Sequence, residues 1–95
     1  MRALVLAIVV GGAGCGPIVY INAVTNHAQS SVDAATAAGA AKIAPYWYTR
    51  ATLFLHLARE EAARADFQGA NHFGRLADEA ATVALRKVDD AKAGK

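Results

Sequence analysis

The sequence predicts an all-α protein: an antiparallel two- or three-helix hairpin or bundle that follows an N-terminal signal peptide. Alanine supplies 24 of the 95 residues, and it is the residue that favours the helix most. After Thr25 the chain has no period-two run of β-branched or aromatic residues, which half-buried strands require. Apolar residues instead recur every three or four positions, as on one face of a helix. A chain of this length forms at most one small domain.

Residues 1–14 are predicted to be a signal peptide. Arg2 supplies a short positive start, residues 3–10 form an apolar run, and the small residues of 11–14 complete the exit. Such a segment is removed and takes no part in the fold. We expect three parts: the signal peptide over 1–14, a lipidated N-terminus with a tether and a first helix over 15–44, and a helical hairpin over 45–95.

Cys15, the only cysteine, is the predicted lipidation site. Gly12, Ala13, Gly14 and Cys15 resemble the lipobox of bacterial lipoproteins, except that Gly12 stands where that motif usually has Leu. The resemblance implies that the Cys15 thiol takes a diacylglyceryl group and becomes the new N-terminus. Buried acyl chains contribute about 0.8 kcal/mol per methylene to membrane attachment. In lipoproteins of this kind, Asp directly after the lipidated cysteine favours retention at the inner membrane. This chain has Gly16 at that position, so the resemblance implies the outer membrane.

Two other interpretations of the N-terminus stay open. Residues 3–24 are almost entirely apolar, and about 20 such residues span a bilayer, so the segment could be an uncleaved anchor. Four glycines and Pro17 interrupt it, and proline inside a helix costs roughly 3 kcal/mol. Alternatively, Cys15 is an unmodified, small apolar residue in a buried segment.

The first helix is expected to begin near Pro17 and to continue to about Ala44. Gly39 costs about 1 kcal/mol relative to alanine inside a helix, so it is the alternative point at which this element breaks. The predicted apolar stripe has spacings of three or four and consists of Ile21, Val24, Ala28, Val32, Ala35, Gly39 and Ile43.

Pro45 marks the start of a second helix that runs to about Ala65, because the residue before proline is disfavoured in helical geometry. Leu53 and Leu57 form a shoulder beside its apolar stripe. The stripe itself consists of Trp47, Ala51, Phe54, Ala58, Ala62 and Ala65. This width predicts contact with more than one neighbouring helix.

Asp66 is a predicted N-cap in the turn over residues 65–70, and Phe67 is expected to fold back over the hairpin. The third helix is expected from about Gln68 to Lys92. Its predicted buried face consists of Phe73, Leu76, Ala77, Ala80, Ala84 and Val88. The two helices therefore form the hairpin.

Two segments within residues 37–88 are distinctive: Ala-Gly-Ala-Ala-Lys-Ile-Ala-Pro, which ends at Pro45, and the turn Ala-Asp-Phe-Gln-Gly-Ala. With these segments the region resembles an uncharacterised family of bacterial envelope lipoproteins with a small Ala-rich helical domain, often found ahead of OmpA-like domains. The turn is also similar to that of tetratricopeptide hairpins, although an array needs at least three repeats. The resemblance implies a hairpin and an envelope location, and it implies no reaction.

Chemical motifs are sparse, so we expect neither an enzyme nor a cofactor or metal site. His27, His56 and His72 lack a second ligand at a spacing that would place a pair on one helix face. Glu60 and Glu61 point about 100° apart on a helix, which suits a charged flank better than acid–base catalysis. The formal net charge is +2, and the basic residues do not gather on one face, so a nucleic-acid partner is not expected.

The aromatic cluster at Pro45 suggests a binding function. Trp47 is expected to anchor the core, while Tyr46, Tyr48 and Arg50 could contact a partner, since aromatics and arginine dominate binding hot spots. We therefore expect a membrane-anchored lipoprotein with a structural or protein-interaction role, bound to lipid through Cys15 and to an unknown envelope protein. Homo-oligomers are possible because Ala-rich faces pack closely. The alternative is a non-lipidated accessory subunit of a larger membrane-associated complex, held by an uncleaved anchor.

Overall fold

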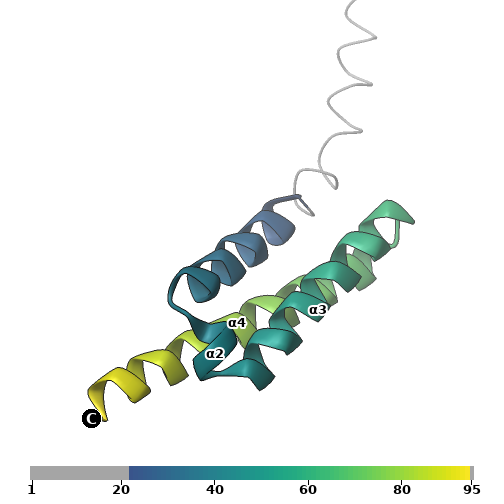
Figure 1. The fold of residues 1–95 in the computed structure, drawn as a ribbon. Helices are drawn as coiled ribbons and strands as arrows, with labels where there is room; N and C mark the ends of the chain where they lie inside the picture. Colours follow the sequence, from purple (N-terminus) through teal and green to yellow (C-terminus); the bar gives the residue numbers. More distant parts are fainter. Residues whose placement is uncertain (1–21, 95) are drawn as a thin grey trace, which may run out of the picture.

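A computed structural model describes residues 22–94, and this part of the chain is helical with no strand, which confirms the all-α prediction (Figure 1). The elements are an N-terminal helix described over residues 22–37, the one-turn α2 (Ala40–Ile43), α3 (Pro45–Ala63) and α4 (Phe67–Ala93). The predicted signal peptide, Cys15 and the tether lie outside the described residues.

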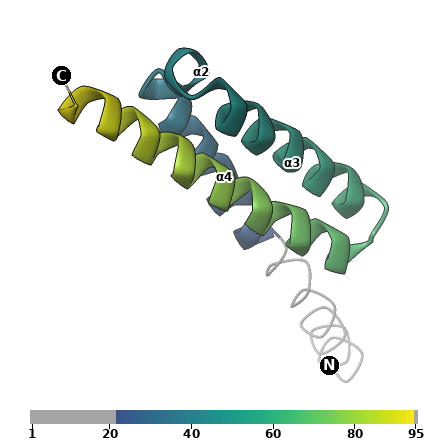
Figure 2. The same cartoon turned by 90° about the horizontal axis from the view of Figure 1, so that it is seen from below.

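α3 and α4 form the antiparallel hairpin that the sequence predicts (Figure 2). Pro45 occupies the first turn of α3, where its missing N–H would have no helical partner. Asp66 is the N-cap of α4, and its side chain accepts a hydrogen bond from the backbone N–H of Gly69 at 3.0 Å. The N-cap prediction is therefore confirmed, and both helix ends fall within two residues of their expected positions.

The turn between α3 and α4 contains a residue in the left-handed region that is not glycine. Ala65 has a φ of 62°. The backbone N–H of Ala65 donates to the carbonyl of Ala62, and the N–H of Asp66 donates to the carbonyl of Glu61. These two bonds form the Schellman motif that closes many helices, usually with glycine in the left-handed position. Ala65 thus belongs to the turn, and its place in the predicted α3 stripe was wrong.

The expected continuous helix to Ala44 is wrong, and the break at Gly39 is the alternative that the structure adopts. Gly39 has a φ of 84° and separates the N-terminal helix from α2. Glycine adopts this backbone region without the steric cost of a Cβ. The chain can therefore reverse here, and α2 packs against both α3 and α4.

The core is built mainly from alanine. Its buried cluster consists of Ala28, Val32, Ala35, Ala40, Ala44, Ala51, Leu55, Ala77, Ala80, Ala81, Ala84 and Val88. Small side chains allow the helix axes to approach closely. Gly74 marks one such approach, because a Cβ at this position would lie 2.9 Å from the Cγ1 of Val24 in the N-terminal helix. The alanine content that predicted helices therefore also sets how they pack.

The leucine that α3 buries differs from the prediction. Leu55 is buried with Ala51 and Ala58, whereas Leu53 on the predicted shoulder is 52% exposed. On α4 the predicted Ala77, Ala80, Ala84 and Val88 are buried, and the sequence reasoning missed the buried Ala70, Gly74 and Ala81. The face of α4 is wider than predicted because two helices, α3 and the N-terminal one, cover it.

Candidate functional site

The aromatic cluster at the start of α3 lies at the surface and surrounds an arginine. Tyr46 is 63% exposed, and its ring packs edge-on against Trp47 with the ring centroids 5.1 Å apart. The guanidinium carbon of Arg50 lies 5.7 Å from the centroids of both rings and 5.0 Å from that of Phe54. Such cation–π contacts hold the cationic group over apolar rings.

Arg50 is stabilised by these rings although one of its donors is unused. Its Nε is buried and has no hydrogen-bond partner. The salt bridges found among the described residues involve other basic groups. A guanidinium carries five N–H donors suited to carboxylates, so the cluster presents a cation that a partner's acidic group could bind.

Tyr48 points to a different neighbour from Tyr46. Its hydroxyl lies 2.8 Å from the Oγ1 of Thr36 in the N-terminal helix, and its ring packs against the buried core. The structure therefore brings Tyr46 and Arg50 together on one face of α3 and places Tyr48 on another. Trp47 is half-buried and also packs against the core.

A longer surface feature continues from Tyr46 along α3. We call it the outer stripe, and it consists of Tyr46, Arg50, Leu53, Leu57, Glu60 and Arg64. Leu53 is 52% exposed and Leu57 is half-buried. The side chains of Glu60 and Arg64 are 43% and 68% exposed. Sequence reasoning placed Leu53 and Leu57 on a shoulder of the buried face, and their spacing from Tyr46 was the signal that could have revealed the stripe.

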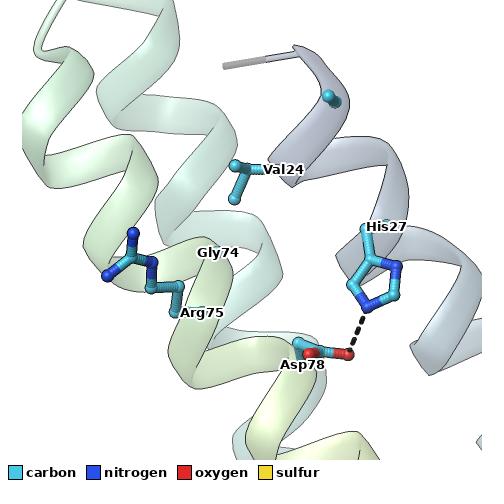
Figure 3. A pocket seen from close by; sticks show the side chains of 6 residues that line it. Val24, His27, Gly74, Arg75 and Asp78 are labelled. Carbon is cyan, nitrogen blue, oxygen red and sulfur yellow. Dashed lines mark ion pairs between the residues drawn. The ribbon is translucent and has the colours of Figure 1, made fainter. Parts of the chain in front are cut away.

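A polar cluster joins the N-terminal helix to α4. The carboxylate Oδ1 of Asp78 accepts a hydrogen bond from Ser31 and lies 3.3 Å from the Nε2 of His27. Figure 3 shows His27 and Asp78 facing each other. Both line an open groove of about 260 Å³. The groove is lined by Ala23, Val24, His27, Gly74, Arg75 and Asp78.

The order of groups in this cluster does not match nucleophilic catalysis. A catalytic serine donates its proton to a histidine that a carboxylate orients, so the histidine lies in the middle. Here Asp78 lies between Ser31 and His27. The arrangement instead connects two helices through the contacts that Asp78 makes with Ser31 and His27.

Two carboxyl groups meet where the chain leaves α3 and enters α4: that of Glu61 near the end of α3 and that of the N-cap Asp66. The hydrogen bond between Glu61 and Asp66 raises the pKa of Glu61, and partial burial adds to this effect. The N–H of Gly69 lowers the pKa of Asp66, and Glu61 contributes in the same direction. A Cβ on Gly69 would lie 2.5 Å from the Oδ2 of Asp66, so glycine leaves room for the cap. This pair has a structural role at the start of α4.

The expectation that no histidine has a second potential ligand on its own helix face is wrong for His56, because Glu60 follows it by four residues in α3. His56 Nε2 is 3.0 Å from Glu60 Oε2 within α3, and the ring of His72 lies 5.4 Å from that of Phe73. Among residues 22–94 no group of three or more His, Cys, Asp or Glu side chains could hold a metal ion. In the same part of the chain no helix is both long and apolar enough to cross a membrane.

Comparison with protein-family models, with curated proteins and with solved structures finds no match to this chain. The resemblance to envelope lipoproteins therefore stays a prediction from the sequence. The outer stripe of α3 is the surface on which a functional interpretation of the folded body depends.

Proposed function

We propose that the protein is a lipid-anchored lipoprotein of the bacterial cell envelope, in the outer membrane, with a structural role that depends on binding another protein. The anchor part of the proposal rests on Cys15, which follows Ala13 and Gly14 after a one-arginine start and an apolar run. Acyl chains on Cys15 would provide stable attachment without a transmembrane helix.

The binding part of the proposal rests on the outer stripe. Tyr46 and Leu53 expose large apolar surfaces on one helix face, and Arg50 lies between them over aromatic rings. Aromatic and arginine side chains are enriched among the residues that dominate binding energies. The single observation that carries the interaction role is therefore this exposed combination on a rigid helix.

Lipidation is tested by labelling cells that express the full chain with an alkyne fatty acid and by mass spectrometry of the mature N-terminus. We expect label on a protein that begins at Cys15, and no label on the Cys15→Ser variant. Gly12→Leu restores the usual lipobox residue and should increase the processed fraction. An unlabelled wild-type protein with an intact N-terminus would instead support the accessory-subunit alternative.

The interaction role has its own test. A photo-crosslinking amino acid at position 53 should give a discrete protein adduct in intact cells. The same amino acid at position 82, which is exposed on α4, should not. Equal yields at both positions, or no adduct at either, would argue against binding through the outer stripe.

A further inference from the structure

The outer stripe has the repeat of a coiled-coil interface. From Tyr46 to Arg64 its six residues are separated by alternating steps of four and three residues. This heptad spacing keeps them in one line along a helix that pairs with another helix. Leucines occupy the two central positions and charged groups occupy positions on either side of them. The residues that contact α4 and the N-terminal helix lie on other faces of α3.

The charges of the stripe complement each other when two copies run antiparallel. With the two-fold axis midway between Leu53 and Leu57 on the outer stripe, Leu53 of one copy faces Leu57 of the other. The same axis places Arg50 opposite Glu60, and Tyr46 opposite Arg64. In heptad notation Arg50, Leu57 and Arg64 hold a positions, and Tyr46, Leu53 and Glu60 hold d positions. Each of the three pairs therefore joins an a position to a d position, which is how antiparallel coiled coils align. The contact is isologous, so each pair occurs twice.

A parallel arrangement lacks this complementarity. Each residue would then face its own counterpart, which sets Arg50 against Arg50 and Glu60 against Glu60. Like charges opposite each other disfavour an interface and so discriminate against that arrangement. The sequence order of charges along α3 therefore specifies orientation as well as partner.

We propose that the outer stripe of α3 binds the outer stripe of a second copy of this chain in an antiparallel coiled-coil contact. This inference rests on the proposed interaction role and deepens it by naming the partner. Three aromatic rings already hold the guanidinium of Arg50 at this face of α3, so little side-chain freedom is lost when a carboxylate of the second copy binds it.

The pairs that Glu60 and Arg64 make within α3 do not oppose the contact. Glu60 lies beside His56 and Arg64 beside Glu61, each within one turn of the same helix. Exposed pairs of this kind contribute little to stability. Glu60 can therefore bind Arg50 of the second copy, whether or not its contact with His56 in the same helix persists.

A charge-swap experiment tests the proposal. The full chain carries Cys15→Ser, which removes both acylation and disulfide formation, and its mass is measured by sedimentation velocity in a density-matched detergent. We expect a protein mass about twice the 9.9 kDa of one chain. Arg50→Glu and Glu60→Arg should each weaken the dimer by about tenfold or more, and the double variant should return to within about threefold of the parent.

The control is Arg86→Glu, which makes the same charge change at an exposed position of α4 and should leave the dimer unchanged. Circular dichroism checks that each variant stays helical. A monomer at every accessible concentration, single variants that match the control, or a double variant that fails to recover would each overturn the inference. If the protein is monomeric while position 53 crosslinks to a different protein, the proposed interaction role stands and the self-association fails.

Discussion

The contact between α3 and α4 and the contact between the N-terminal helix and that hairpin are built from different groups. Between α3 and α4, the rings of Phe54 and Phe73 stack with their centroids 6.1 Å apart. A short hydrogen-bonded turn at Ala65 and the capped start of α4 connect these two helices. The α3–α4 contact is thus stabilised both by large apolar side chains and by the short turn that keeps the two helices adjacent.

The N-terminal helix is held by smaller apolar groups and by polar bonds. Ala28, Val32 and Ala35 are its buried residues. Its hydrogen bonds across the interface join Ser31 to Asp78, Thr36 to Tyr48 and Gln29 to Arg59. Alanine burial removes less apolar surface from water than leucine or phenylalanine burial does. From this difference we expect the hairpin to supply most of the stability and the N-terminal helix to be the part that detaches more easily.

Leu55→Ala should have the largest effect, because it leaves a cavity in the contact between α3 and its neighbours. We expect a loss of about 2–3 kcal/mol in the free energy of unfolding. Chemical denaturation followed by circular dichroism measures this loss. Leu53→Ala, on the exposed face of the same helix, should change stability by no more than about 0.5 kcal/mol. Equal losses for the two variants would contradict the assignment of Leu55 to the core.

Gly74→Leu should detach the N-terminal helix, since even a Cβ at Gly74 comes within 2.9 Å of Val24. Overpacking of this kind costs about 1–3 kcal/mol. Hydrogen exchange should become faster over residues 22–37 while the central amides of α3 and α4 stay protected. Thr82→Leu, at an exposed position of α4, is the control. Uniformly faster exchange in all helices would show that the two contacts form one cooperative unit.

Tyr48→Phe removes only the hydroxyl that meets Thr36, and it should cost about 0.5–1 kcal/mol. Tyr48→Ala also removes the packed ring and should cost more, about 1–2 kcal/mol. Tyr46→Ala, next to it but exposed, should leave the melting temperature nearly unchanged. Thermal melts of the three variants measure this order. A larger loss for Tyr46→Ala than for Tyr48→Ala would reverse the roles given to these tyrosines.

Ala65→Gly should stabilise the hairpin by about 0.5–1 kcal/mol, because a left-handed backbone is strained for alanine and free of strain for glycine. Ala63→Gly, two residues earlier and inside α3, should destabilise by a similar amount. The same substitution thus has opposite signs on the two sides of the helix end. Denaturation midpoints measure both, and a destabilising Ala65→Gly would contradict the left-handed turn.

Local signals in the sequence were enough to locate the hairpin and its ends. Pro45 started α3 where the restriction on the preceding residue predicted, and Asp66 capped α4 as its side-chain chemistry predicted. Both signals act over a few residues and need no tertiary context. The division of leucines on α3 could not be predicted in this way, because Leu53, Leu55 and Leu57 are equally apolar. Which of them is buried depends on where the neighbouring helices lie.

The candidate site shows the same limit. Tyr46, Tyr48 and Arg50 form one group in the sequence, and adjacent aromatics beside an arginine favoured a single contact surface. The structure separates Tyr48 from the other two, because side chains two residues apart on a helix point in different directions. The groove beside His27 and Asp78 joins residues about fifty positions apart, which no local pattern brings together.

The sequence by itself determined that this protein is helical, where its two hairpin helices begin, and that Gly39 could break the element before them. These properties follow from backbone preferences, which are local. Only the tertiary structure decided which faces are covered, because burial depends on the position of other helices. It placed Leu55 inside, left Leu53 and Tyr46 outside, and so left the outer stripe of α3 at the surface.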